Sequence, residues 1–543
     1  MESHLLSYNR TSFREAAASP CGSGVIYDAL TFTSLSPAAT EDLNGVVPPE
    51  WYGDDLALKE FLESFCIPPT VIDQAPISTD ISTEDVVKGF KTWSEGTSTS
   101  PSSRHLEHYK AIIQDPELLQ CLTWFLQVVT QSGIAVSRWC NATNVLIEKD
   151  SGSPKINRLR IIHLFEAFFN FFLKLQWGKC LICRADELGL LNQGQFGSRR
   201  GKMAIEPVML LQLATDLCQS LKHNLARFDN DASACYDRII VTLGMLAARK
   251  FGMPTSAVRT HAEALRLMKY TVKTIFGVSD ANYNWTVFEP LFGTGQGSGA
   301  SPAVWLTLIV IIMDTFERMI PERMEFTSPD GQITNSRIVD AFVDDTPIGF
   351  TDGSGKHTYG TMIERLQEIS QTWEHILHLS GGSLILSKCS WYVMSWDWIN
   401  GRPKIREREA SDSTVSLIHS GTQMKTDIQC IALGEAPRIL GVYLSPTGDF
   451  SKHISILKTK ADTFALRLKS PLLKASNALL FHQTIYVPTM RYSLATLAVD
   501  EEYLKSIQTR LLSSLLQKMG VNKHFPVAFR HGPTRYGGLD LLV

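Results

Sequence analysis

The spacing of apolar residues predicts helices along most of the chain. Stripes with steps of three and four residues occur near 55–65, over 116–132 and from 363 to 377, where glycines 381 and 382 supply a stop. From Ser451 onward such stripes continue, so this part should be all helical. The aromatic run over 165–172 also has helical spacing, and we interpret it as core, with contact to a nucleic-acid base as the alternative.

Short strand signals interrupt these helices at 224–229, 336–343 and 347–350. Long helices mixed with a few short strands predict an α+β fold. No internal repeat of 20–50 residues is visible, which argues against solenoids and propellers. No stretch approaches 18 apolar residues without interruption, so a membrane span is not expected.

Composition divides the chain into two unlike ends. The first 100 residues hold 15 acidic and five basic residues and are rich in Ser, Thr, Pro and Gly, so we expect residues 1–96 to be an acidic, loosely folded segment. A linker of Ser, Thr and Pro at 97–104 places a domain boundary near 97. The chain as a whole is 44% hydrophobic, which excludes general disorder.

The charge distribution changes the meaning of a net charge of −3. Residues 450–543 hold 13 Lys and Arg against five Asp and Glu, which is typical of a surface that meets phosphate; a solvated helical face is the alternative. Ten scattered cysteines and the absence of a signal peptide favour a reducing, intracellular location. Cys180 and Cys183 have zinc-like spacing but no second pair nearby, so we interpret them as structural.

Two adjacent aspartates form the most informative segment, Phe342-Val-Asp344-Asp345. In a hairpin, strand alternation sends Asp344 to the same face as Phe342 and places Asp345 near the turn, where either carboxylate can reach a hard cation. Neighbouring carboxylates repel each other, so they usually need a compensating cation such as Mg²⁺. A solvated Asp-Asp turn is the alternative interpretation.

A second acidic segment follows the strand signal at 224–229. This segment contains three aspartates, Asp229, Asp231 and Asp237, at the end of the predicted strand and in the helix-like stretch that follows it. One carboxylate from a strand beside another from a hairpin is the minimum apparatus for two-metal phosphoryl transfer, in which the ions lie about 3.5–4 Å apart. An aspartate that caps a helix is the alternative.

A glycine-rich segment, Gly293-Thr-Gly-Gln296-Gly297-Ser-Gly-Ala-Ser-Pro302, precedes the apolar run 303–313. Its glycines permit close approach of the backbone to a ligand, and Pro302 can open a helix. A flexible loop is the alternative, because glycine-rich loops before helices are not specific to nucleotide sites.

Taken in order, these segments resemble the motifs of a reverse transcriptase, most closely that of non-LTR (LINE-like) retrotransposons. The family motif D-x-x-x-A-[FY]-D is similar to 231–237, with Cys235 in the alanine position, and it selects Asp231 rather than Asp229 as the metal ligand. The motif G-x-x-Q-G-x-x-x-S-P resembles 293–302. The motif [YF]-x-D-D resembles 342–345, with phenylalanine in place of the commoner tyrosine.

Four further segments extend the resemblance over about 97–543. Q-x-G-[FS]-R-x-G-[RK] resembles 195–202, and the fingers segment R-P-I-x-L resembles 160–164, where Ile161 replaces the proline. The segment 382–388 resembles a lysine-bearing loop, and 439–442 resembles a primer-grip hairpin. The resemblance thereby implies that template or primer is contacted by Gln195, Gly197, Arg199 and Gly441. It also implies that the triphosphate of the nucleotide is held by Lys149 and Arg160.

The resemblance also implies a right-hand polymerase with an antiparallel palm sheet backed by helices and an all-helical thumb. The fingers would span 97–205, the palm with part of the fingers 206–445, and the basic thumb 446–543. Asp231, Asp344 and Asp345 would hold two Mg²⁺, or Mn²⁺, and Tyr236 would lie under the sugar of the dNTP and exclude a 2′-hydroxyl. Gln296 and Gly297 would line the nucleotide pocket. Lys388 would protonate the pyrophosphate, with a plain surface lysine as the alternative.

The expected activity is RNA-directed DNA synthesis with an RNA template, a DNA primer and dNTPs. The alternatives are an RNA-dependent RNA polymerase, disfavoured by Tyr236, and an inactive, domesticated palm domain that only binds RNA. We recognise no endonuclease or RNase H, so nicking is expected from another domain or protein. A nuclear site of action is expected, with a cytoplasmic ribonucleoprotein stage as an alternative.

Overall fold

The structure is a computed structural model with a mixed α and β fold, 48% helix and 15% strand, which confirms the predicted class. The predicted boundary near 97 lies outside the residues that the structure describes, which are 2–94, 101–149, 152–153, 155–233 and 235–541.

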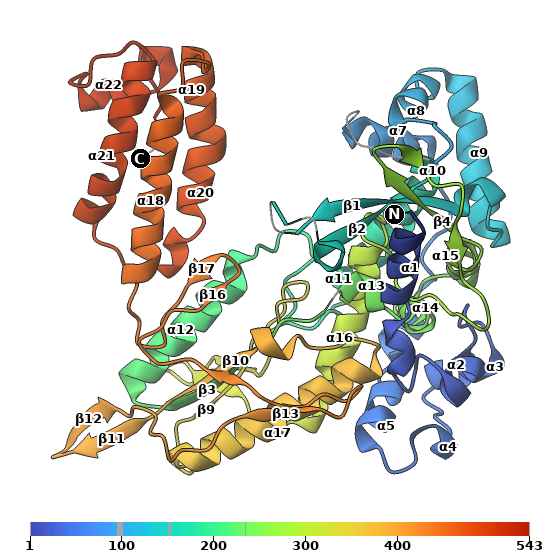
Figure 1. Cartoon of the computed structure of the whole chain (residues 1–543), viewed down its shortest axis with the longest axis horizontal. Helices are drawn as coiled ribbons and strands as arrows, with labels where there is room; N and C mark the ends of the chain where they lie inside the picture. The colour runs from blue at the N-terminus through green and yellow to red at the C-terminus, as the bar shows by residue number, and fades with distance from the viewer. Residues whose placement is uncertain (1, 95–100, 150–151, 154, 234, 542–543) are drawn as a thin grey trace.

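A four-stranded sheet, called the central sheet below, has the strand order β15-β10-β3-β9. Figure 1 labels β10, β3 and β9 close together. β3 runs antiparallel to both neighbours, with Phe228 opposite Ile348 on one side and Trp391 on the other. The edge strand β15 is the exception in this sheet, because it pairs with β10 in the parallel direction. The bounds are β3 (Asn224–Asp229), β9 (Ile348–Asp352), β10 (Ser390–Met394) and β15 (Gln429–Cys430).

Both faces of the central sheet are covered, because side chains alternate along β3. Ala226 and Phe228 join the main hydrophobic core, whereas Leu225 joins a smaller core on the other face with Ala214 and Cys218 of α12. The predicted strand at 224–229 and the predicted helix at 363–377 are confirmed. Two helices contact β3 directly, α12 (Ile205–Leu221) and α17 (Tyr359–Leu379). Behind them, α16 (Ser301–Met319) packs on α17, and α14 (Val241–Lys250) packs on α16.

The predicted strand over 336–343 is wrong. The strand β8 ends at Arg337, and the chain then makes only isolated pairings, such as Val339 with Ile348. The pairs of short strands outside the two larger sheets are β7 (Met324–Thr327) with β8 (Thr334–Arg337), β11 (Trp396–Ile399) with β12 (Arg402–Ile405), β13 (Ser416–Ile418) with β14 (Lys425–Asp427), and β16 (Arg438–Ile439) with β17 (Val442–Tyr443).

A second sheet of five strands is built on the antiparallel hairpin β1–β2, with β4 parallel to β1. The aromatic run that follows β2 is buried, which confirms its interpretation as core. The strands are β1 (Asn141–Glu148), β2 (Leu159–Phe165), β4 (Lys269–Thr274), β5 (Gly277–Val278) and β6 (Tyr283–Asn284). The helices in the same part of the sequence are α8 (Leu106–Ile112), α9 (Pro116–Ser132), α10 (Ala167–Leu173), η4 (Lys174–Leu181), α11 (Ile182–Glu187) and α15 (Thr255–Arg266).

The N-terminal segment is not loosely folded, contrary to its composition. Residues 2–94 are largely helical, and Phe61, Phe65 and Phe90 are fully buried in the main core. Phe90 stacks on Phe171 with ring centroids 4.5 Å apart. A few well-placed apolar residues therefore outweigh a polar average. The helices are α1 (Glu2–Ser12), η1 (Glu15–Ala18), α2 (Gly24–Leu30), α3 (Pro37–Leu43), α4 (Pro49–Tyr52), α5 (Leu56–Glu63), α6 (Pro69–Ile72) and α7 (Thr83–Thr92).

The residues after 450 form a helical bundle, as predicted, with a hydrophobic core of its own. Figure 1 shows this C-terminal bundle on the opposite side of the molecule from α7, α8 and α9. The bundle contains α18 (Ser451–Leu468), α19 (Ala475–Phe481), η6 (His482–Tyr486), α20 (Val487–Arg491), η7 (Leu494–Thr496), α21 (Glu501–Lys518) and α22 (Val527–His531). Within the described part of the chain, no helix combines the length and the apolar character that a membrane span requires.

Candidate functional site

Asp231 lies just beyond the end of β3, between two other segments of the chain. Its backbone pairs with Asp345 on one side. On the other side its carbonyl oxygen accepts a hydrogen bond of 2.9 Å from the backbone N–H of Ile385. The fold therefore brings Asp231 beside the hairpin at 342–345, which lies more than a hundred residues further along the sequence.

The hairpin differs in detail from the prediction. Phe342 and Asp345 are the paired residues, and Val343 with Asp344 forms the turn between them. Asp344 is thus at the tip rather than on a strand face with Phe342. Val343 has a φ of 63°, which is strained for a β-branched residue, and the Trp305 indole N–H donates a 2.6 Å hydrogen bond to its carbonyl oxygen.

A buried pair of side chains ties the two acidic segments together. The Asn230 amide N–H₂ donates to the backbone oxygen of Thr346 at 2.5 Å, and the Thr346 hydroxyl donates to the Asn230 amide oxygen at 2.7 Å. Each residue adjoins one of the aspartates, and both are buried. Because buried polar groups are costly to leave unpaired, this reciprocal pair fixes the spacing of Asp231 and Asp345.

The three carboxylates influence each other electrostatically. Burial, followed by repulsion from Asp344, Asp231 and Asp229, raises the pKa of Asp345 to about 6. Burial also raises the pKa of Asp344, and repulsion from Asp231 adds to this rise, whereas nearby Lys388 and Arg160 oppose it. The arrangement therefore favours a positive partner for these side chains, although the carboxylates of Asp344 and Asp345 still reach solvent.

Lys388 supplies one such partner. It lies in the short helix η5 (Leu386–Lys388), and its ammonium Nζ is 2.9 Å from Oδ2 of Asp231. Both side chains are exposed, so this ion pair is weak and can be exchanged for other partners.

A single cavity of about 680 Å³ collects most of the predicted site residues. Its walls come from the β1–β2 hairpin, α13 (Cys235–Arg238), the glycine-rich segment, the hairpin tip and η5. Figure 1 labels β1, β2 and α13. Asp345 is outside the lining. The predicted residues that line the cavity are Lys149, Arg160, Asp231, Tyr236, Gln296, Gly297, Asp344 and Lys388.

The glycine-rich segment follows the cavity wall in close contact with other backbone. The Gln296 carbonyl oxygen accepts a hydrogen bond of 2.6 Å from the His163 N–H of β2. A Cβ at Gly297, where φ is 113°, would lie 2.4 Å from the His163 oxygen, so only glycine fits. Similarly, a Cβ at Gly293 would lie 2.7 Å from the backbone oxygen of Asp237.

Three residues expected at template or primer do not line the cavity. Gln195 is buried, and its backbone pairs with Ala341, the residue just before the hairpin at 342–345. A Cβ at Gly197 would lie 2.5 Å from the Val343 nitrogen. Arg199 pairs with Asp186 at 2.6 Å. The structure gives these residues packing contacts that support the hairpin, and contact with nucleic acid stays a prediction.

Gly441, the fourth such residue, lies in the turn between β16 and β17 with a φ of 88°. The hydroxyl of Tyr492 donates to the neighbouring Leu440 oxygen at 2.8 Å, which joins this turn to the C-terminal bundle. The turn is close enough to the carboxylates for Arg438 to lower the pKa of Asp345, against the larger effect of burial.

The donor set fits a divalent cation that is shared with a substrate. Within the residues described, no group of three or more His, Cys, Asp or Glu side chains is arranged to hold a metal ion. Mg²⁺ in nucleotide sites, however, typically takes one or two carboxylates and completes its shell with phosphate oxygens and water. Asp231 and Asp344 supply two hard oxygen ligands in one cavity, and the repulsion between them favours such an ion.

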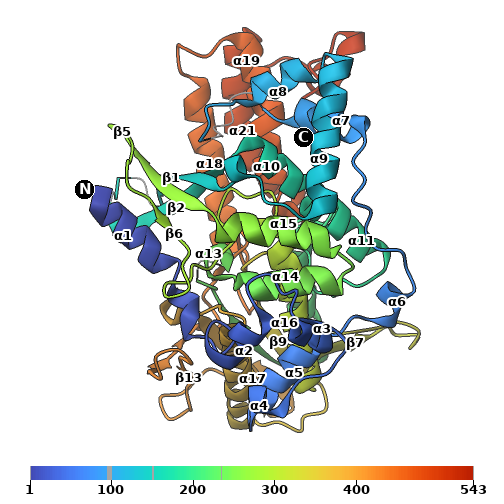
Figure 2. The same ribbon diagram turned by 90° about the vertical axis from the view of Figure 1, so that its right-hand side faces the viewer.

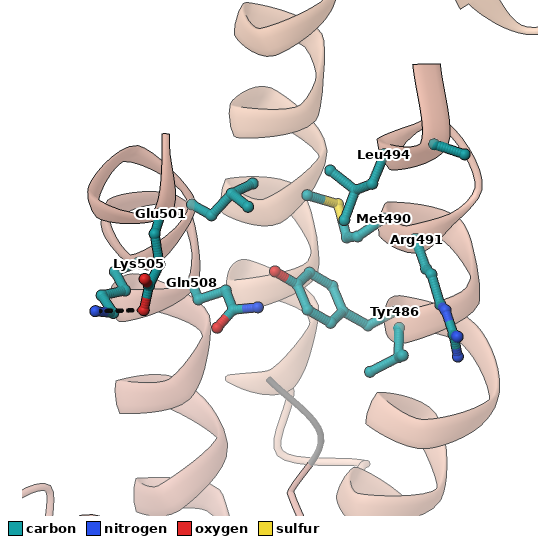
Figure 3. A pocket seen from close by; sticks show the side chains of 10 residues that line it. Tyr486, Met490, Arg491, Leu494, Glu501, Lys505 and Gln508 are labelled. Carbon is teal, nitrogen blue, oxygen red and sulfur yellow. Dashed lines mark ion pairs between the residues drawn. The ribbon is translucent and has the colours of Figure 1, made fainter. Parts of the chain in front are cut away.

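A second cavity of similar size has none of this chemistry. It measures about 710 Å³ and lies in the C-terminal bundle between Tyr486, Met490 and the start of α21 (Figure 3). An ion pair of 2.7 Å between Glu501 and Lys505 is at its edge. Although this cavity is slightly larger, it contains no residue predicted to bind metal or nucleotide.

Sequence reasoning overlooked two features of the site. Asp237 belongs to the motif at 231–237, which gives it no role. Its buried Oδ1 nevertheless has no hydrogen-bond partner among the described residues, and burial raises its pKa to about 7. The N-terminal residues Tyr8, Ser12 and Glu15 line the same cavity. No motif in the first 20 residues could have indicated this.

Comparison with known proteins gives no family assignment. No protein-family model matches the chain, and no curated protein matches it.

Removing the Asp345 charge should stabilise the metal-free protein at neutral pH. A carboxyl with a higher pKa in the folded than in the unfolded protein stabilises the fold at low pH, and this contribution disappears as the pH rises through about 6. We expect Asp345→Asn to raise the Tm in EDTA by roughly 2 °C at pH 7.5 and to leave it unchanged at pH 4. Asp397→Asn, at an exposed site on β11, is the control. A lower Tm at pH 7.5 would contradict the repulsion.

Proposed function

We propose that the chain is an RNA-directed DNA polymerase of the reverse transcriptase type, related to non-LTR retroelements. One observation carries this proposal: residues that three separate sequence motifs single out, among them Asp231, Gln296 and Asp344, line one cavity. In this proposal the central sheet is the palm, the β1–β2 sheet the fingers and the C-terminal bundle the thumb. RNA is the template, and a DNA primer and dNTPs are the substrates.

Asp231 and Asp344 would hold the catalytic ions, with Asp345 beside them. Two Mg²⁺, or Mn²⁺, would make the primer 3′-hydroxyl more acidic and neutralise the departing pyrophosphate. The carboxylates fit this role because burial and mutual repulsion raise the pKa values of Asp344 and Asp345, and bound cations would offset both effects. Lys388 would release Asp231 in favour of the ions and become free to donate a proton to the pyrophosphate.

Two cations in the cavity lining would hold the triphosphate. Lys149 follows the end of β1 and Arg160 lies at the start of β2, so the hairpin presents both cations to the cavity. Tyr236 of α13 lines the same cavity and would serve as a platform for the sugar. Gln296 and Gly297 complete the pocket with backbone that approaches closely. The proposal includes a nuclear site of action.

Primer extension tests the activity directly. On an RNA template with Mg²⁺ and dNTPs, the wild-type protein should extend a DNA primer, and Asp344→Asn should reduce the rate by at least about 10³-fold, since it removes a charge that acts on the reacting groups. Asp397→Asn should retain full activity. Equal product from wild type and Asp344→Asn would refute the mechanism. Extension with rNTPs alone would favour an RNA polymerase, and RNA binding without any extension an inactive palm.

The ring of Tyr236 should determine the choice of sugar. We expect Tyr236→Ala to raise rNTP incorporation relative to dNTP by about 10-fold or more, because the ring that would clash with a 2′-hydroxyl is gone. Tyr236→Phe keeps the ring and should discriminate like the wild type. The ratio of kcat/KM for dATP and ATP measures the effect, and an unchanged ratio in Tyr236→Ala would overturn this role.

A further inference from the structure

The N-terminal helix α1 and the short helix η1 form part of the cavity that we assign to the nucleotide. Tyr8 and Ser12 lie one turn apart on α1, so they share a face, and Glu15 follows in η1. All three line the cavity together with Tyr236 and Asp344. α1 packs on β4, and Figure 2 shows it beside β6 at the edge of the five-stranded sheet.

An aromatic contact anchors this segment beneath the glycine-rich wall. Phe13 is buried, and its ring meets His163 edge-on with centroids 5.0 Å apart. His163 in turn donates its backbone N–H to Gln296. The Phe13 carbonyl oxygen also accepts a hydrogen bond of 2.8 Å from the N–H of Phe292, just before the glycine-rich segment.

Ion pairs hold the segment at two further points. Glu15 pairs with Arg238, which directly follows Tyr236 and Asp237 in α13, and the Arg238 side chain also donates to the Gly381 oxygen at 3.0 Å. Arg10 and Arg14 both pair with Glu289. The Arg238 guanidinium therefore offsets part of the Glu15 charge beside the cavity.

These contacts hold α1 and η1 against β2, α13 and the segment before the glycine-rich loop, so they form one wall of the cavity. On the basis of the polymerase function proposed above, we propose that this N-terminal wall positions the incoming 2′-deoxynucleoside triphosphate, with Tyr8 and Ser12 as its contact surface. The Ser12 hydroxyl donates to the Tyr8 carbonyl oxygen at 3.1 Å, so Ser12 contributes a small, already satisfied surface that leaves room for the nucleotide. The wall acts on nucleotide affinity and not on the chemical step.

A filling substitution tests the wall. Ser12→Phe adds a ring on the cavity side of α1, whereas Ser7→Phe adds the same ring at an exposed position of the same helix that does not line the cavity. In single-nucleotide incorporation by the full chain, Ser12→Phe should raise the KM for dATP about 10-fold and leave kcat within about twofold, because ground-state binding is lost. Ser7→Phe should match the wild type.

A second variant removes a contact instead of filling space. Tyr8 packs in part against the main core, so Tyr8→Ala should lower the Tm. Assayed well below that Tm, it should also raise the KM for dATP, by roughly fivefold, with kcat within about twofold. If the wild type is active and neither Ser12→Phe nor Tyr8→Ala changes the KM for dATP, the proposed role of the N-terminal wall is refuted. The proposed polymerase function is then unaffected. A wild type that neither extends a primer nor binds dATP with Mg²⁺ would overturn both.

Discussion

Repulsion between three aspartates is the constraint on which the rest of the site depends. Asp231, Asp344 and Asp345 are held together by backbone pairing at the end of the central sheet, and the buried pair of Asn230 and Thr346 prevents them from separating. Burial, and after it repulsion from the neighbouring aspartates, raises the pKa of Asp345 to about 6. A fold that maintains such a cluster gains a position where cations are strongly favoured.

The elements around the carboxylates supply complementary features. The β1–β2 hairpin presents Lys149 and Arg160, the glycine-rich segment brings backbone within contact of β2, and α13 adds Tyr236 to the same lining. The N-terminal segment closes the same cavity and is bound to α13 through Glu15 and Arg238. Segments that are far apart in the sequence thus line one cavity. The contacts that hold each segment there also stabilise the fold.

Much of the framework could be predicted from the sequence. The strand at Asn224–Asp229 and the helix at Pro116–Ser132 have the predicted bounds, because clear apolar patterns, and at the helix a capping Asp115 and Gly133, delimit them. The motif order also selected eight residues of one cavity. The N-terminal segment was misjudged because its average composition is polar, while its folding depends on a few phenylalanines that insert into a core made by other segments. The turn at Val343 and Asp344, and the packing of Gln195 and Arg199, depend on tertiary contacts that no local pattern encodes.

The position of the cations tests the central claim most directly. Crystals of the protein with an RNA template, a DNA primer, a non-hydrolysable dNTP and Mn²⁺ allow the metal to be located by anomalous diffraction. We predict two peaks about 3.5–4 Å apart, within coordination distance of the carboxylates of Asp231 and Asp344, with Lys388 displaced from Asp231. An intact ion pair between Lys388 and Asp231, with no Mn²⁺ at either carboxylate, would contradict the account.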